Sequence, residues 1–266
     1  MRKEYNDEAF TVVGELEAYL LGVLYGDGCM PKRYASEGLN WQRRVSLKLK
    51  DKEPIEFLGK CVGREGHVRR DRKGYWYMEI RNTGIVESLE RLGLSTEKTL
   101  KQNVPQIEKS MYRHFLRGLL DSDGSVQKDL RVRLNVVGKE ILEWLGKIFE
   151  EMGFGYSVRV SYRFIGGEGC LSTVSLRTAY GNSIRFLDWL YEDANYYMKR
   201  KHDLYLEVKS ARNRGLLERD GTTETEREIT LPKRVEELSY VLGIIWSSGY
   251  VEDGSEVLKV KCGTVS

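Results

Sequence analysis

Two aspartates, Asp27 and Asp123, are the residues whose setting in this chain points most directly to chemistry. Each ends an apolar run and is followed by glycine, in LLGVLYGDG at 20–28 and LRGLLDSDG at 116–124. If both runs are helices that pack together, the two carboxylates meet, repel one another and raise each other's pKa. A hard divalent cation with oxygen ligands, Mg²⁺ being the first candidate, would compensate that repulsion. Solvated helix ends are the alternative for any single Asp-Gly pair, but two copies in matching frames favour a shared metal site.

The two apolar runs have the pattern of helices that approach each other closely. Small residues recur four apart on one face of each run, at Gly22 and Gly26 and at Gly118 and Ser122. We expect the glycines after the aspartates, Gly28 and Gly124, to end the helices in the left-handed conformation. Each run is far shorter than the roughly 20 apolar residues of a membrane span, so we expect no membrane partner.

The two segments closely resemble the LAGLIDADG motif, which is named for its residues and defines a family of homing endonucleases and related RNA maturases. The resemblance implies one aspartate per motif, each working on one strand of a DNA duplex across the minor groove. On that basis Asp27 and Asp123 are the expected catalytic metal ligands, assisted by the backbone carbonyls of Gly26 and Ser122. The expected cofactor is Mg²⁺ or another divalent cation.

Phosphodiester hydrolysis also benefits from a cation near each phosphate, which would stabilise the transition state. Lys50, at the end of a predicted strand, and Lys128, after the second motif, are the candidates for this catalytic role, with ordinary surface lysine as the alternative. Tyr25 departs from the motif, which has an acid there, whereas Asp121 keeps the acid. In the family this is a packing or solvent position. Leu49 lies where some relatives carry a polar residue near the metal water.

The similarity between the two halves extends beyond the motifs. RVSLKL, KE and IEFLGK at 44–60 are matched in the same order by RVRLNV, KE and LEWLGK at 131–147. A duplicated unit of about 100 residues explains this conserved order. We therefore predict a first unit at 1–105, a second at 106–212, and a linker plus an incomplete third segment at 213–266.

Periodicity predicts the elements of each unit. Alternating patterns predict strands at 43–50, 67–70, 75–82, 130–136, 157–164 and 172–178, and helical patterns follow at 52–61, 84–92, 139–152 and 181–193. The expected fold is α+β, with two pseudo-twofold αββαββα units. The motif helices pack at the interface, and the antiparallel sheets form a DNA-binding saddle. The polar stretch from 209 to 225 is predicted to be a linker.

The polar faces of the predicted strands suggest a nucleic-acid surface. Alternation leaves each sheet an apolar face for its helices and a basic, hydrogen-bonding face outside. Such two-stranded ribbons fit the major groove, where Arg, Lys, Gln and Asn read base edges. An ordinary solvated sheet face is the alternative, but here Arg dominates and acids are few. The predicted DNA contacts are Arg33, Gln42, Arg44, Ser46, Lys48, Tyr77, Arg81, Arg131, Arg133, Asn135, Arg159, Arg163 and Arg177.

Composition adds only broad limits. The chain has 43 Lys and Arg against 40 Asp and Glu, a net charge of +3 that by itself would not diagnose nucleic-acid binding. Its 4 cysteines form no CxxC pair and its 3 histidines have no metal-ligand spacing, which argues against structural zinc or a disulfide framework. The charged N-terminus has no signal-peptide pattern. We expect the cytoplasm, or the compartment that holds the host genome, including an organelle matrix.

Three functions fit these features. The first is a site-specific homing endonuclease that cuts a long asymmetric site in double-stranded DNA, encoded in an intron, since no intein splicing signature is present. The second is a maturase that binds intron RNA. The third is a nuclease-dead DNA-binding regulator. Retention of both acids argues against the third, whereas maturases can retain both acids too, so the second stays open.

The sequence from 240 to 249, YVLGIIWSSG, repeats the motif a third time, with Ser248 in the place of the acid. An amphipathic core helix packed on the second unit is one interpretation. A remnant of a third unit that cannot bind metal is the one we favour. The two-unit core predicts a monomer. The apolar face of the tail must be buried on the second unit or against another chain, so self-association through the tail stays open.

Overall fold

The computed structural model describes residues 5–31, 43–96, 98, 102–127, 131–165, 168–176, 180–213, 250–251 and 258–259. For 159–165, 168–176, 180–181, 211–213 and the four residues beyond 249, only the backbone is described. The chain divides into two compact units, Met1–Asp220 and Gly221–Ser266. In the smaller unit the described residues form an antiparallel pair, β8 (Tyr250–Val251) with β9 (Leu258–Lys259). The third motif-like segment lies outside the described residues.

The first half of the larger unit alternates helices with antiparallel strands. Its elements are α1 (Glu15–Asp27), β1 (Val45–Leu49), α2 (Glu53–Cys61), η2 (Glu65–His67), β2 (Arg69–Arg70), β3 (Trp76–Ile80) and α3 (Thr83–Arg91). The strands form a sheet in the order β1-β3-β2. Just after α1, Cys29 forms an antiparallel bridge with Ser46 of β1, so the end of α1 lies against the edge of this sheet.

The second half repeats this plan and extends it. Its elements are η3 (Lys109–Met111), α4 (Tyr112–Asp123), β4 (Gly124–Val126), β5 (Val132–Val137), α5 (Lys139–Glu151), β6 (Ser157–Ile165), β7 (Glu168–Leu176), α6 (Tyr180–Tyr191) and α7 (Lys199–Asn213). The antiparallel sheet has the order β4-β5-β7-β6. The predicted α+β fold with antiparallel sheets is therefore confirmed.

The strands bury one face as their alternation predicted. In β5, Val132, Leu134 and Val136 are buried, while Arg133 and Asn135 between them are half-buried. Because successive side chains of a strand point to opposite faces, the apolar set packs under α5 and the polar set lies on the other face.

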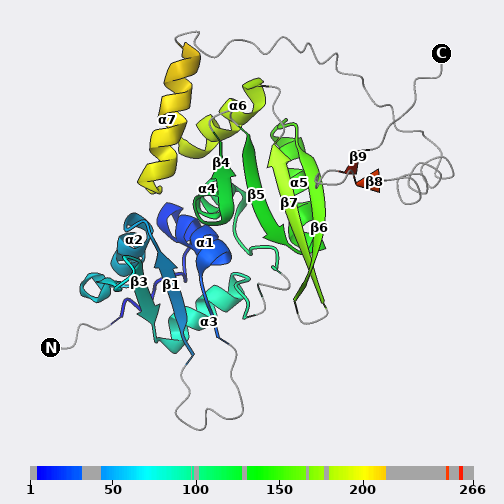
Figure 1. The fold of residues 1–266 in the computed structure, drawn as a ribbon. Coiled ribbons are helices and arrows are strands. Elements are labelled where there is room, and N and C mark those ends of the chain that lie inside the picture. The colour runs from blue at the N-terminus through cyan, green and yellow to red at the C-terminus, as the bar shows by residue number, and fades with distance from the viewer. Residues whose placement is uncertain are drawn as a thin grey trace, which may run out of the picture. The chain divides into compact units, whose positions relative to one another are not determined.

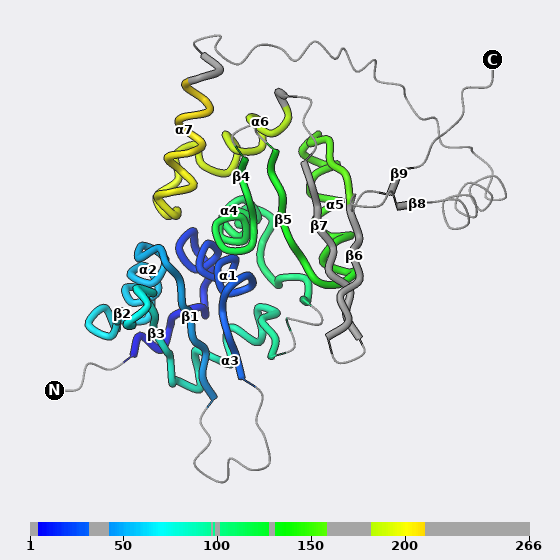
Figure 2. The backbone as a smooth tube through the Cα atoms, in the orientation of Figure 1, coloured from blue at the N-terminus to red at the C-terminus, as the bar shows by residue number. Residues whose placement is uncertain are grey.

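Helices α1 and α4 lie side by side between the two sheets (Figure 1). Figure 2 traces the same arrangement along the backbone, with α1 in blue and α4 in green. Both helices are buried over most of their length, including Leu20 and Leu24 of α1 and Phe115 and Leu119 of α4. Neither they nor any other described helix is long and apolar enough to cross a membrane. The motif helices thus form the centre of the unit and bring their C-terminal ends together.

Two features differ from the predicted elements. The short strand β4 follows α4 without a break and pairs with β5. Helix α7 extends to Asn213, so the predicted linker from 209 to 225 is wrong at its start. Tyr205 and Val208 of α7 are buried, and Lys209 forms an ion pair of 2.8 Å with Asp188 of α6. These contacts hold a helix whose largely polar sequence shows little amphipathic periodicity.

Candidate active site

The C-terminal ends of the two motif helices touch through small residues. A Cβ added at Gly26 of α1 would lie 2.1 Å from Oγ of Ser122 and 3.1 Å from the backbone N of Asp123 in α4. The Ser122 hydroxyl donates to the Gly118 carbonyl at 2.9 Å and therefore folds back on its own helix. Asp27 and Asp123, the residues that follow Gly26 and Ser122, leave the two helices at this shared junction.

The glycines after the aspartates are needed for space, and the predicted left-handed conformation is wrong. Gly28 has φ −63° and ψ 152°, and Gly124 has φ −93° and ψ 168°, both extended. A Cβ at Gly28 would lie 2.5 Å from the carbonyl O of Leu24, and one at Gly124 would lie 2.6 Å from that of Leu120. The chain leaves each helix directly toward its sheet, into the Cys29 bridge or into β4, and so passes close to the last helical turn.

Both aspartates are perturbed by their surroundings. Asp27 is exposed and Asp123 is half-buried, yet loss of hydration raises the pKa of each carboxyl above its ordinary value. The negative charge of Asp27 raises the pKa of Asp123 further. The two carboxylates therefore interact, which is the repulsion that the sequence predicted for packed motif helices.

Two lysines that the sequence analysis did not select provide the opposing charge. The ammonium groups of Lys98 and Lys201 lower the pKa of both aspartates, against the effect of lost hydration. Lys98 donates to the backbone carbonyls of Tyr25, at 3.1 Å, and Gly26 at the end of α1. Lys201, on the first turn of α7, is buried and donates to the carbonyls at the end of α4. Burial lowers its pKa to about 8.

The carbonyls that receive Lys201 belong to Leu120 and to Gly124, the latter at 2.7 Å. Each helix C-terminus thus holds one lysine, whose positive charge suits the negative end of the helix dipole. The signal that could have found these lysines is positional, since each follows the last predicted helix of its unit. That signal is weak, because neither lysine belongs to a repeated motif.

Of the two lysines predicted from sequence, Lys50 is among the described residues. The exposed ammonium of Lys50 lies over the Tyr75 ring, 5.8 Å from its centroid, and is absent from the charges that act on Asp27 and Asp123. The charges that act on the aspartates therefore favour Lys98 and Lys201 over Lys50, whose catalytic role stays a prediction. Lys128 lies outside the described residues.

On the first sheet, the predicted DNA-contacting residues lie on the polar face but several are paired with acids. Ser46 is in register with Glu79, and Lys48 with Tyr77. Three basic residues of this face have acidic partners: Arg44 approaches Glu79 at 3.6 Å, Lys48 approaches Asp71 at 2.6 Å, and Arg81 also pairs with Glu79. The expectation of few acids on this face is thus wrong, since Glu79 and Asp71 partly neutralise it.

On the second sheet, Arg131 is exposed and Arg133 half-buried, and Arg133 is in register with Ser125 and Ser175. Asn135 donates from Nδ2 to the backbone carbonyl of Asp123 at 2.7 Å. This bond joins the middle of the sheet to the end of α4, so Asn135 supports the site geometry. Two further predicted contacts, Arg159 and Arg163, lie in β6, where the backbone alone is described, whereas Arg33, Gln42 and Arg177 lie outside the described residues.

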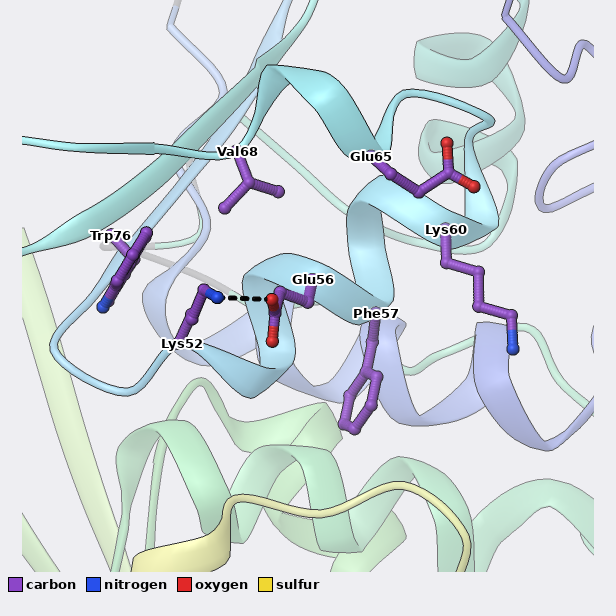
Figure 3. Close-up of a pocket in the computed structure, with 7 residues that line it drawn as sticks. All are labelled: Lys52, Glu56, Phe57, Lys60, Glu65, Val68 and Trp76. Atoms are coloured by element: carbon purple, nitrogen blue, oxygen red, sulfur yellow. Dashed lines mark ion pairs between the residues drawn. The ribbon is translucent and has the colours of Figure 1, made fainter.

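A pocket of about 570 Å³ lies between α2 and the β2–β3 hairpin, apart from the aspartates (Figure 3). Phe57, Val68 and Trp76 form its apolar walls, and Lys52 pairs with Glu56 at 2.7 Å across it. Trp76 is in register with Leu49, at the far end of β1 from the Cys29 bridge. Its wall residue Phe57 also packs edge-on against Tyr19 of α1 and against Tyr196.

The helix ends provide hard oxygen donors of the kind that Mg²⁺ prefers. A divalent cation shared by Asp27 and Asp123 would remove the repulsion that raises the pKa of Asp123. The Gly26 carbonyl accepts a hydrogen bond from Lys98, so this predicted ligand already has a partner. Within the described part of the chain, no cluster of three or more His, Cys, Asp or Glu side chains is placed to hold a metal. Asp27 and Asp123 therefore fit a cation whose other ligands are oxygens that His, Cys, Asp and Glu side chains do not supply, such as backbone carbonyls or water.

Comparison with known proteins agrees with the fold described above. Residues 110–185 match the family model described as a LAGLIDADG-like domain. Mesophilic variants of the homing endonuclease I-DmoI are 14% identical, with a TM-score of 0.50 over 66% of this chain and 94% of theirs. I-DmoI in complex with DNA and Ca is 15% identical, with a TM-score of 0.49 over 66% of this chain and 88% of that one.

The LAGLIDADG homing endonuclease I-GzeII, in complex with its DNA target, is 10% identical, with a TM-score of 0.47 over 88% of this chain and 97% of that one. The family match begins just before α4 and includes the second motif and its sheet. The predicted resemblance to the LAGLIDADG family is confirmed by the match over the second motif.

Proposed function

We propose that this chain, whose residues 110–185 match a LAGLIDADG-like domain, is a site-specific, metal-dependent endonuclease of the homing type that cuts both strands of a DNA duplex. One observation carries the proposal. Asp27 and Asp123 leave the ends of two packed helices within electrostatic reach of each other, and two lysines approach the same ends. Paired carboxylates with paired cations are the groups that phosphodiester hydrolysis requires.

Asp27 and Asp123 would hold the cation, and Mg²⁺ is the ion whose preference for oxygen fits them best. When bound, such an ion supplies positive charge beside the scissile phosphate and favours ionisation of water. The aspartates themselves provide the negative charge that holds the ion at the junction of α1 and α4. Their location at the negative ends of the helix dipoles strengthens that attraction.

Lys98 and Lys201 would act on the phosphate groups. Each ammonium is fixed by backbone carbonyls at a helix end, so it needs little rearrangement to stabilise developing negative charge. The lowered pKa of Lys201, to about 8, also allows it to take part in proton transfer near neutral pH. We assign one lysine to each strand, since each lies at the end of a different motif helix.

The polar faces of the two sheets would bind the duplex and position it over the helix ends. Exposed Arg131 and half-buried Arg133 of the second sheet suit base or phosphate contacts. On the first sheet, Lys48 and Arg81 would exchange their acidic partners for phosphates when DNA binds. The DNA affinity that these phosphate contacts provide falls as the salt concentration rises.

Selection of cut sites from a random library tests the proposal. The purified full chain is incubated with randomised duplex DNA and Mg²⁺, and the new ends are sequenced, with EDTA and an Asp27→Asn/Asp123→Asn double variant as controls. A homing-type endonuclease produces paired ends within one long consensus site, in the Mg²⁺ sample alone. Enrichment of bound DNA without any new ends would instead identify a DNA-binding regulator. Retention of structured RNA in place of duplex DNA would identify a maturase.

A further inference from the structure

Asp121, two residues before Asp123, is fully buried and accepts three hydrogen bonds. Its Oδ2 accepts from the Tyr19 hydroxyl at 2.9 Å and from the backbone N–H of Met198 at 2.6 Å, and its Oδ1 accepts from the Tyr191 hydroxyl at 2.6 Å. A buried carboxylate without partners would be very costly, so these three donors are what make the position tenable. They come from α1, from α6 and from the start of α7, which Asp121 therefore ties to α4.

The bond to Met198 sets the starting point of α7. The Met198 carbonyl accepts from the backbone N–H groups of Lys201 and His202, which is the first turn of the helix. Since each helical residue turns the chain by about 100° and advances it by about 1.5 Å, a shift of one residue at this start would move Lys201 off its carbonyls. Asp121 also attracts the Lys201 ammonium directly. The Asp121 side chain thus fixes the start of α7 and also attracts the Lys201 ammonium that α7 carries.

The first half holds its lysine in a different way. Tyr25 takes the place of Asp121, and its hydroxyl donates to the Leu92 carbonyl at 3.3 Å. Gln102, four residues after Lys98, donates from Nε2 to the Tyr25 carbonyl at 3.1 Å, and the same carbonyl accepts from Lys98. Gln102 also exchanges two bonds with the backbone of Val137, in the second half: its Oε1 accepts at 2.8 Å and its N–H donates at 2.6 Å. The two lysines therefore depend on unrelated anchors.

We propose that Asp121 is a positioning residue that holds Lys201, and not Lys98, against the helix end that carries Asp123. The consequence for catalysis rests on the proposed function, whereas the anchoring itself is a property of the folded chain. Loss of Asp121 would disable one half-site while the Lys98 half-site keeps its own anchor.

Amine labelling of the full chain tests the anchoring without DNA. Brief acetylation is followed by peptide mass spectrometry, and the labelling of Lys201 and Lys98 is normalised to the exposed Lys139. Asp121→Asn keeps the shape of the side chain but cannot accept all three bonds, so we expect Lys201 labelling to rise about tenfold or more, with Lys98 unchanged. Tyr191→Phe removes one donor and should raise Lys201 labelling by a smaller factor. Circular dichroism verifies that each variant is folded.

Tyr205→Phe is the matched control. Its hydroxyl, also on α7, donates to Asp188 at 2.6 Å and does not reach Asp121, so its loss should leave Lys201 labelling unchanged. Unchanged Lys201 labelling in folded Asp121→Asn and Tyr191→Phe would overturn the proposal, and so would an equal rise at Lys98. If Asp121→Asn fails to fold, the Lys201 labelling of folded Tyr191→Phe decides whether the proposal holds.

A nicking assay adds the catalytic arm. If the anchor serves one half-site, Asp121→Asn and Lys201→Met leave the same DNA strand uncut, whereas Lys98→Met leaves the opposite strand uncut. Opposite strands for Asp121→Asn and Lys201→Met would overturn the assignment. A wild-type chain that cuts no DNA would refute the proposed function, and the labelling result would still decide whether Asp121 anchors Lys201.

Discussion

Gly22 and Gly118 lie reciprocally against the backbone of the opposite motif helix. A Cβ added at Gly22 would be 2.0 Å from the carbonyl O of Phe115, and one at Gly118 would be 2.0 Å from that of Tyr19. Real Cβ atoms do not approach backbone oxygens so closely. The relationship fixes the spacing of α1 and α4, and with it the separation of the aspartates at their ends.

Gly22→Ala and Gly118→Ala should therefore each lower the free energy of unfolding by about 3 kcal/mol or more, because the added methyl meets fixed backbone. Urea denaturation followed by circular dichroism measures the change. Gly66→Ala is the matched control, since no atom lies within 4 Å of its added Cβ, and should change stability little. Equal, small effects at all three positions would show that the helices can separate without cost.

The helix pair and the sheets could be predicted because their signals are local. Small residues four apart mark a helix face, and alternation in β1 and β5 marks a half-buried strand. The glycine conformations were predicted wrongly because close approach to Leu24 and Leu120, and not backbone φ, requires glycine there. The αββαββα plan implied a strand before β5, but β4 received no predicted range because its three residues are too few to show an alternation.

The cationic part of the site could not be predicted from local pattern. Lys98 and Lys201 lie far along the chain from the aspartates, and only tertiary folding returns them to the helix ends. Asp121 was expected at a packing or solvent position of the motif. Its three buried partners come from three other segments, so no spacing in the sequence indicated that it ties them together.

Asp27→Asn and Asp123→Asn should each abolish cleavage of at least one strand while leaving DNA affinity largely unchanged. An amide is a poor ligand for Mg²⁺, whereas recognition lies on the sheets. A gel-shift and nicking assay on one duplex measures both properties, with Mg²⁺ removed by EDTA as the reference for no cleavage. Full double-strand cleavage by either variant would exclude that aspartate as a catalytic ligand.

Lys98→Met and Lys201→Met should slow cleavage by roughly 100-fold, since each removes a fixed charge that stabilises the transition state. Lys50→Met is the matched control. It removes an equal charge just after β1, where the ammonium lies over the Tyr75 ring, and should retain the wild-type single-turnover rate. A rate loss in Lys50→Met equal to that in the other two variants would mean that only net charge matters.

Arg133→Ala should weaken binding to the cognate duplex by about 1–3 kcal/mol and relax preference at one base position, as expected for loss of an arginine–guanine contact. Lys139→Ala removes the same charge from an exposed position on α5, which covers the opposite face of the sheet. It should alter affinity only slightly. Competition binding against single-base variants of the site distinguishes the two, and identical effects would indicate that the sheet face does not read the sequence.

His114 should make the protein less stable in mild acid. Burial, reinforced by the charges of Arg117 and Arg113 and opposed by Glu15, lowers the pKa of His114 to about 4, from an ordinary value of 6.5. Arg117 donates to its Nδ1 at 3.0 Å, so the ring is neutral and forms no ion pair with Glu15. Below about pH 6.5, His114 binds a proton in the unfolded chain but stays neutral in the folded chain. The free energy of unfolding that is present above pH 6.5 is therefore lost progressively as the pH falls toward 4.

Acidification from pH 7 to pH 5.5 should lower the free energy of unfolding by about 1 kcal/mol through His114 alone. Urea unfolding of wild type and His114→Gln at both pH values isolates it, because the other titrating groups are common to both chains. The variant should be less stable at pH 7, through loss of the Arg117 contact, but should lose less on acidification. Equal losses in the two chains would show that the imidazole can take up its proton in the folded state.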